Sequence, residues 1–138
     1  MSERQMQIGE VAERTGLSLR TIRHYEEVGL VTPSARSKGG FRLYTDRDVE
    51  RLMVVRRMKP LDFSLEEMRE LLELIDQAVD MRSAALSEAE RVRLAERLES
   101  YRKVTDARCE TLRSRLEMAE DFAATLHRRV REVGAHHA

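Results

Sequence analysis

The sequence predicts a mainly α-helical fold, in which an N-terminal domain of four helices and a small β-hairpin precedes one long helix. Three observations support this prediction. Two short amphipathic segments meet at a glycine within residues 8–30, and a glycine-containing segment of alternating polarity follows at residues 34–44. Finally, no proline or glycine interrupts residues 87–133, which favours a long continuous helix.

Residues 8–30 have the pattern of a helix-turn-helix. Apolar residues, among them Val11, share one face of a first short helix, and Gly16 can adopt the positive φ angle that reverses the backbone. Ser18 then offers its hydroxyl to the free amides of a second helix, which ends at Gly29. Two short helices joined by such a turn are typical of DNA-binding proteins.

The second of these helices has two distinct faces. Ile22 and Tyr25 are expected to point inward. The outward positions carry cationic and hydrogen-bonding side chains, namely Arg20, Thr21, Arg23 and His24. A helix with this outer face is suited to the major groove of DNA.

Residues 34–44 predict a small β-hairpin, or wing. The pair Gly39–Gly40 suits a turn, and the residues after it alternate in polarity. Because an isolated hairpin is marginal in water, we expect Phe41 and Leu43 to pack on the neighbouring helices. The outer side of the wing would be lined by Arg36, Lys38 and Arg42.

Two capping boxes start the third and fourth helices. The first pairs Thr45 with Asp48, and the second pairs Ser64 with Glu67. The third helix is expected to end near Pro60. The predicted buried residues are Val49, Leu52, Met53 and Val55 in the third helix, and Leu65, Met68, Leu71, Leu72 and Ile75 in the fourth. The basic residues expected on the exposed side of the third helix, where they would extend the basic surface, are Arg51, Arg56, Arg57 and Lys59.

We expect residues 1–75 to form the N-terminal domain, 76–86 a junction, 87–133 the long helix and 134–138 a frayed tail. Ser87 with Glu90 forms a third capping box, and the long helix would extend roughly 70 Å. Its apolar residues follow coiled-coil spacing in two runs and form a narrow seam along the helix. A stutter separates the two runs, and Thr105 and Cys109 supply the contacts within it. The runs are Leu94, Leu98 and Tyr101, then Leu112, Leu116, Ala119, Ala123, Leu126, Val130 and Val133.

A seam this narrow needs a partner helix. No second helix of matching length is predicted within the chain, so we expect the same helix of a second copy, in a two-fold homodimer.

Charge is distributed unevenly along the 138 residues, although the net formal charge is zero at pH 7. Residues 1–60 carry 12 Lys and Arg against 8 Asp and Glu, a net charge of +4, whereas residues 61–138 carry 13 against 17, a net charge of −4. The N-terminal part can therefore face phosphates.

Other features exclude several classes of protein. The single cysteine, Cys109, fits a reducing compartment, and neither a membrane span nor a signal peptide is expected, which predicts a cytoplasmic protein without a membrane partner. No Ser/His/Asp set, paired-carboxylate motif or glycine-rich phosphate loop occurs, since Gly39–Gly40 precedes a predicted strand. We expect no enzymatic activity, no cofactor and no bound metal.

Three segments of the chain resemble the MerR family of bacterial transcriptional regulators: IGEVAERTGLSLRTIRHYEEVGLV, GGFRLYTDRDVERL and DFSLEEMRELLEL. The resemblance implies a winged helix-turn-helix domain and a long helix that pairs antiparallel with its mate in a homodimer. It also implies an inverted-repeat operator in double-stranded DNA, which the dimer bends and undertwists so that RNA polymerase can use a promoter with overlong spacing. Some members mainly repress, and the sequence does not decide between activation and repression.

The resemblance also implies roles for individual residues. Arg20, Thr21 and Arg23 would contact base edges or adjacent phosphates. His24 and Tyr25 would lie near the DNA backbone, although Tyr25 suits the core equally well. The wing residues would position the domain on DNA rather than read its sequence. The full set of expected DNA contacts is Ser18, Arg20, Thr21, Arg23, His24, Tyr25, Arg36, Lys38, Arg42 and Tyr44.

The chain departs from the family's sensing members. Metal-sensing relatives hold soft ions with cysteines at the start of the dimerisation helix, but residues 80–87 contain none. Cys109 is interpreted as a small seam residue, with a redox sensor as the alternative. Asp62 stands where relatives commonly have glycine. Because no appended ligand-binding domain is expected, an unidentified small-molecule effector would bind between helices or against the N-terminal domain.

A second hypothesis uses the same fold differently. An architectural or accessory DNA-binding protein would need no inducer and would discriminate little between DNA sites. A regulator should instead bind one operator tightly above a weak background.

Overall fold

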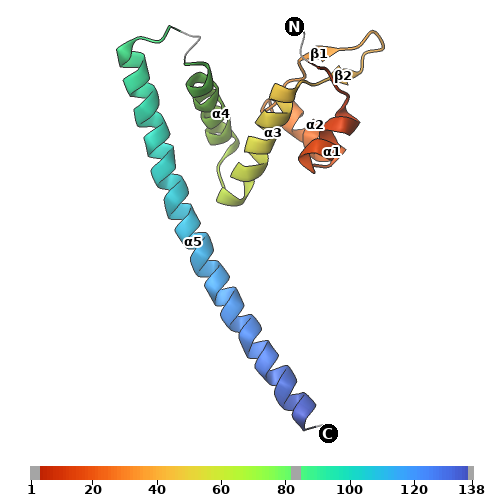
Figure 1. The fold of residues 1–138 in the computed structure, drawn as a ribbon, viewed down its shortest axis with the longest axis vertical. Coiled ribbons are helices and arrows are strands. Elements are labelled where there is room, and N and C mark those ends of the chain that lie inside the picture. Colours follow the sequence, from red (N-terminus) through yellow and green to blue (C-terminus); the bar gives the residue numbers. More distant parts are fainter. Residues whose placement is uncertain (1–3, 82–84, 137–138) are drawn as a thin grey trace. The chain divides into compact units, whose positions relative to one another are not determined.

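The computed structural model describes residues 4–81 and 85–136. The chain forms two compact units, one up to Leu98 (the first unit) and one from Glu99 onward (the second unit). The elements are α1 (Ile8–Thr15), α2 (Leu19–Glu27), β1 (Ala35–Arg36), β2 (Arg42–Leu43), α3 (Asp46–Met58), the 3₁₀ helix η1 (Lys59–Leu61), α4 (Leu65–Asp80) and α5 (Glu88–Ala135) (Figure 1). The predicted order of helices, hairpin and long helix is confirmed.

The helix-turn-helix forms as predicted. Gly16 has a φ of 72° and donates its N–H to the carbonyl of Ala12, which ends α1. The Ser18 hydroxyl accepts the N–H of Thr21 at 3.0 Å and so caps α2. Gly29, with a φ of 80°, follows the last turn of α2. Local backbone chemistry therefore sets the geometry of this turn.

The predicted hairpin is confirmed, but its packing differs from the expectation. Strands β1 and β2 pair antiparallel, and Tyr44 exchanges two backbone hydrogen bonds of 2.8 Å with Met6, a pairing that the sequence did not indicate. The expectation that Phe41 packs on the helices is wrong, because 63% of this residue is exposed. Tyr44 is fully buried in its place. The hairpin is thus anchored at its base by Tyr44 and Met6.

Both predicted capping boxes form at α3 and α4, and they begin these helices at the expected places. Leu52 and Leu72 are almost fully buried in the core of the first unit. The prediction that Leu65 is buried is wrong, since 40% of this residue is exposed. Leu65 is the first residue of α4, where few neighbouring side chains can cover it.

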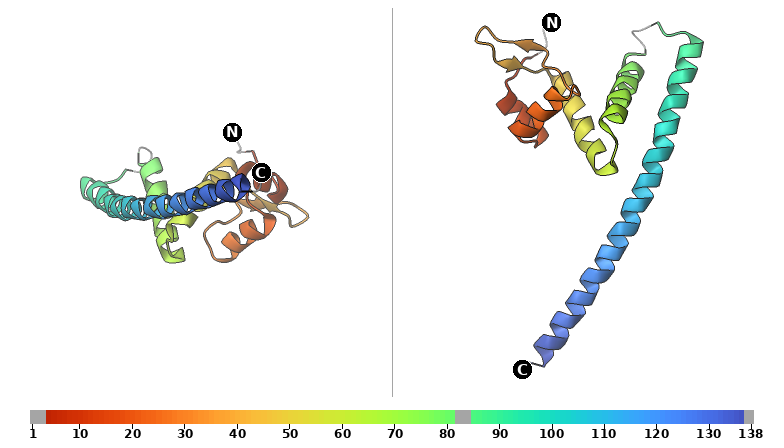
Figure 2. Two further views of the ribbon diagram at one scale, coloured as in Figure 1. Left: turned by 90° about the horizontal axis from the view of Figure 1, so that it is seen from below. Right: turned by 180° about the vertical axis from the view of Figure 1, so that it is seen from behind.

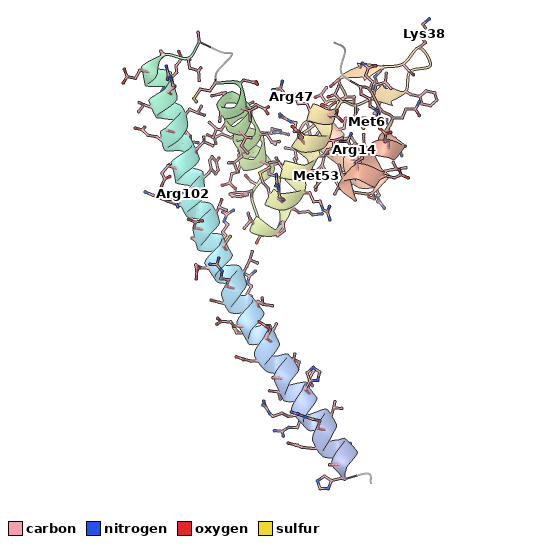
Figure 3. The ribbon with its side chains drawn as sticks, viewed as in Figure 1. Met6, Arg14, Lys38, Arg47, Met53 and Arg102 are labelled. Atoms are coloured by element: carbon pink, nitrogen blue, oxygen red, sulfur yellow. The ribbon has the colours of Figure 1, made fainter. Side chains whose placement is uncertain are left out.

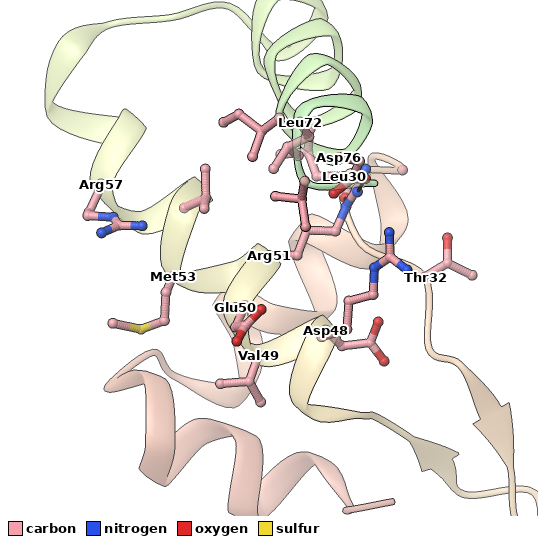
Figure 4. A pocket seen from close by; sticks show the side chains of 15 residues that line it. Leu30, Thr32, Asp48, Val49, Glu50, Arg51, Met53, Arg57, Leu72 and Asp76 are labelled. Atoms are coloured by element: carbon pink, nitrogen blue, oxygen red, sulfur yellow. Dashed lines mark hydrogen bonds and ion pairs between the residues drawn. The ribbon is translucent and has the colours of Figure 1, made fainter. Parts of the chain in front are cut away.

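Two arginines of α3 bind backbone carbonyls at the end of α1 and just beyond the end of α2. Arg51 donates to the carbonyl of Leu30 at 2.8 Å and pairs with Asp76 beside a hollow of about 570 Å³ (Figure 4). Arg56 donates to the carbonyl of Thr15 at 2.7 Å. The expectation that Arg51 is exposed is therefore wrong, because this residue is half-buried and its guanidinium group binds Leu30 and Asp76. Arg56 is exposed as predicted, although one of its guanidinium nitrogens donates to the last carbonyl of α1.

Helix α4 extends to Asp80, five residues beyond the predicted end of the N-terminal domain at residue 75. The capping box of Ser87 and Glu90 forms as predicted at the start of α5. The expectation that Leu94 lies in the dimer seam is wrong, because it is only 6% exposed and lines a small hollow together with Leu74. Leu94 therefore packs within the first unit.

The second unit is a single stretch of α5, which continues without a break to Ala135 (Figure 2). The predicted tail thus begins later than expected, because Gly134 and Ala135 are helical. Arg102 pairs with Glu99 and Asp106 one turn away on either side (Figure 3), which raises the pKa of Arg102 and lowers that of Glu99. Such pairs stabilise an exposed helix.

Several predicted seam residues of the second unit are exposed in the single chain: Leu116 is 59%, Leu126 50% and Val130 70% accessible. Tyr101 and Cys109 are half-buried. None of the described helices is both long and apolar enough to span a lipid bilayer.

The cap of α2 makes a first prediction. Replacing Ser18 with alanine should lower the free energy of unfolding by about 1 kcal/mol, because the amide of Thr21 loses its acceptor. Aspartate at the same position restores an acceptor and should recover most of the loss. Urea denaturation of the two variants measures the difference, and equal stability of wild type and the alanine variant would contradict this role.

Candidate nucleic-acid interface

Helix α2 presents an exposed cationic face. Arg20, Arg23 and His24 are all exposed, while Ile22 and Tyr25 are buried and anchor the opposite face. Among residues 4–81 and 85–136, no side chain makes a hydrogen bond or ion pair with Arg20 or Arg23. All the N–H donors of these two guanidinium groups are thus available to a ligand.

The polar residues at the start of α2 are partly used within the helix. The Ser18 hydroxyl donates to the Thr21 hydroxyl at 2.8 Å and accepts the Thr21 amide. Thr21 is half-buried. The Thr21 hydroxyl accepts from Ser18, so its own O–H remains available to donate to a bound nucleic acid.

The wing carries two further exposed cations. Lys38 lies at the tip of the hairpin (Figure 3), and within the described ranges it makes no hydrogen bond or ion pair. Arg36 donates to the carbonyl of Gly40 at 3.2 Å and stays exposed. The tip of the wing is thus cationic, as predicted for its outer side.

Two predicted DNA contacts are buried. The prediction that Tyr44 contacts DNA is wrong, because the residue is 0% exposed. Burial, together with the neighbouring carboxylate of Glu26, raises the pKa of Tyr44 to about 12, so its hydroxyl stays protonated near neutral pH. Tyr25 is only 6% exposed, which favours the core role over a phosphate contact.

The corner between α3 and α4 adjoins the same face of α2. A hollow of about 370 Å³ lies there, and its lining includes Arg20 and His24 of α2, Lys59 of η1 and Leu65 of α4. Lys59, Arg57 and Arg56 are exposed, whereas Arg51 is half-buried. Of the four arginine and lysine residues predicted to extend the basic surface, Lys59 is the one beside α2.

Asp62, at this corner, has a φ of 58°, a left-handed conformation that glycine adopts more readily. The aspartate therefore preserves the backbone bend that a glycine would favour, at some cost in strain.

Sequence reasoning missed one residue of this region. Glu26 of α2 binds both Arg42 and Tyr44 of the wing, with Arg42 Nε 2.7 Å from its nearer carboxylate oxygen. The only signal in the sequence was a pair of carboxylates, Glu26 and Glu27, at the end of a helix whose first turns carry Arg20 and Arg23. Arg42 is consequently half-buried and its pKa is raised by this hydrogen bond.

Family comparisons agree with this geometry. The profile described as "MerR HTH family regulatory protein" matches residues 6–75, and that described as "MerR, DNA binding" matches residues 49–128. The chain belongs to the MerR family. The MerR-family resemblance of the three sequence segments is therefore confirmed.

Individual relatives are similar to this chain over most of its length. Heavy metal-dependent transcription regulator 2 of Rhizobium meliloti is 40% identical over 99 residues, which cover 72% of this chain and 65% of that protein. The regulator HmrR of Rhizobium leguminosarum is 40% identical over 103 residues, 75% of this chain and 78% of that protein. HiNmlR, a MerR-family regulator lacking the sensor domain and bound to promoter DNA, has the same fold, with a TM-score of 0.61, 23% identity and coverage of 88% and 89%.

Metal ligands do not gather in the described part of the chain. No group of three or more His, Cys, Asp or Glu side chains is close enough there to hold an ion. Cys109 is a free, partly exposed thiol. The absence of a metal or cofactor stays a prediction from the sequence.

Proposed function

We propose that this MerR-family chain is a cytoplasmic transcriptional regulator that binds an inverted-repeat operator in double-stranded DNA as a homodimer. The observation that carries this proposal is the exposed face of α2, where Arg20 and Arg23 have no partner among the residues that the structure describes. A buried opposite face holds the helix rigidly, so the guanidinium groups can form fork-like bonds with guanine or phosphate. The wing, through Arg36 and Lys38, would bind the adjacent backbone.

The dimer would form through the exposed seam of α5, with the helices antiparallel. The exposure of Leu116 and Leu126 supports this pairing, because a monomer would leave a long apolar stripe in water. Leu94 is left out of the interface because it is buried in the first unit. The proposed interface residues are Leu98, Tyr101, Cys109, Leu112, Leu116, Ala119, Ala123, Leu126 and Val130.

Regulation would act through the shape of the DNA. By the family's mechanism, a bound dimer bends and undertwists the promoter so that its two elements align for RNA polymerase. Such distortion costs on the order of 1–6 kcal/mol, which an effector acting on a two-state dimer can supply. Because residues 80–87 contain no cysteine, we propose that the effector is not a soft metal ion held there.

Selection from random duplexes tests the proposal. The protein should enrich one inverted-repeat sequence and bind it at least about 1,000-fold more tightly than an unrelated duplex. A small ratio between the two would instead favour an architectural DNA-binding protein. Failure to bind any duplex at ordinary salt would refute both.

Arg23 makes a second prediction. Replacing it with alanine should weaken binding to the selected duplex by about 1–3 kcal/mol, because a fork contact is lost. The control is Arg131→Ala, which removes another exposed arginine, from α5, without touching the predicted seam. An electrophoretic mobility-shift assay measures both variants. Equal affinities would remove Arg23 from the set of proposed contacts.

A further inference from the structure

Glu26 joins the helix and the wing of the proposed interface. Its carboxylate oxygens lie 2.8 and 2.7 Å from Nε of Arg42, and one of them also accepts the hydroxyl of Tyr44 at 3.2 Å. Only 16% of the Glu26 side chain is exposed. A carboxylate this enclosed, with one donor from β2 and one from Tyr44 just after it, fixes this part of the wing relative to α2.

The contact uses only one edge of the Arg42 guanidinium. Nε donates to Glu26, whereas Nη1 and Nη2 have no hydrogen-bond partner among the described residues. The Arg42 side chain is 37% exposed. Because the guanidinium is planar, holding Nε fixes the direction of the two free amino groups.

We propose that Glu26 is a positioning residue, which holds Arg42 so that its two terminal amino groups bind one DNA phosphate between α2 and the wing. This inference rests on the proposed function. Two parallel N–H groups at the end of a guanidinium match the spacing of two phosphate oxygens. Without Glu26, the long side chain of Arg42 would have to be ordered at the moment of binding, which costs entropy.

Electrostatics alone predicts the opposite result for Glu26. A carboxylate near DNA repels phosphates, so its removal should strengthen binding if Glu26 served only to neutralise Arg42. Positioning instead requires that its removal weaken binding. The sign of the effect therefore separates the two roles.

The experiment measures affinity for the selected duplex over a range of salt concentrations. Arg42→Ala should weaken binding on the order of tenfold and reduce the slope of log affinity against log salt by about one, as one phosphate contact is lost. Glu26→Ala should give a similar loss and slope, and the double variant should be no weaker than Arg42→Ala. Glu26→Gln, which keeps an oxygen that can accept from Nε, should restore most of the affinity.

Two controls separate positioning from folding. Tyr44→Phe removes the second donor but keeps the ion pair, so it should bind with the wild-type slope. Thermal unfolding of every variant shows whether a loss of affinity reflects a loss of fold. A wild-type slope in a folded Glu26→Ala variant, or tighter binding by it, would overturn the proposal.

A measurement without DNA judges the contact independently of the proposed function. In nitrogen NMR spectra of the free protein, the Nε–H of Arg42 should exchange slowly with water, and this protection should disappear in Glu26→Ala. If protection holds but the wild type binds no duplex, the proposed function fails and the phosphate role of Arg42 fails with it. If the wild type binds DNA while Nε–H is unprotected, the positioning role alone is refuted.

Discussion

Replacing both Leu116 and Leu126 with aspartate should convert the proposed dimer into monomers and weaken binding to the proposed operator on the order of 100-fold or more. Each change places a charge in a seam that a partner helix would desolvate, which is costly. A monomer also loses the second half-site, and with it the gain from bivalent binding. Sedimentation velocity measures the mass, and a mobility-shift assay measures the affinity.

The matched control places the same charges elsewhere on the same helix. Met118 is 71% exposed and Ala124 is exposed as well, and both lie off the predicted seam. Met118→Asp with Ala124→Asp should leave the dimer intact. A dimer that survives the two seam changes, or that the control changes disrupt equally, would place the interface elsewhere.

Replacing Leu52 with alanine should lower the free energy of unfolding by about 2–5 kcal/mol. The side chain is 0% exposed within the first unit, so its truncation leaves a cavity as well as losing apolar burial. Leu65→Ala is the matched control, since the same atoms are removed from a site that is 40% exposed. It should cost less than about 1 kcal/mol.

Urea denaturation of the two leucine variants measures this difference. Sequence periodicity assigns both leucines to the core, whereas the structure assigns only Leu52 to it. Equal losses of stability in the two variants would therefore contradict the packing described for α4.

Features set by short-range chemistry were predictable from the sequence. Gly16 marks the turn because of its backbone freedom, and the serine and threonine caps satisfy amides only three residues away. These interactions depend on residues that are neighbours in the sequence. Consequently the helix starts and the position of the hairpin needed no knowledge of the tertiary structure.

Features set by distant neighbours were not predictable. The alternation in the wing is compatible with an inward Phe41, but the pairing of Met6 with Tyr44 draws Tyr44 into the core instead. Leu94 fits the coiled-coil spacing equally well as a seam residue, yet it is buried in the first unit. For Leu94, periodicity indicates that the residue will be covered, but it does not indicate by which element.

Some residues of the candidate DNA interface were predictable from the sequence and others were not. Arg20, Arg23 and Lys38 are exposed and unpaired with any described residue, so their candidacy follows from type and position alone. Arg51 has the same charge and a similar sequence context, but it is used to hold the carbonyl of Leu30. Glu26 has the wrong charge for a phosphate contact, so only its distance from Arg42 indicates a role.

The central claim is that two copies of this chain bind one duplex through a matched pair of α2 helices. Sedimentation velocity on the selected duplex, with protein and DNA detected at separate wavelengths, measures the number of chains bound per duplex. We expect two chains per intact duplex. When one half-site is scrambled, we expect a single chain per duplex, and only at protein concentrations far above those needed to bind the intact site. A complex of one chain with one intact duplex at saturation would contradict the claim.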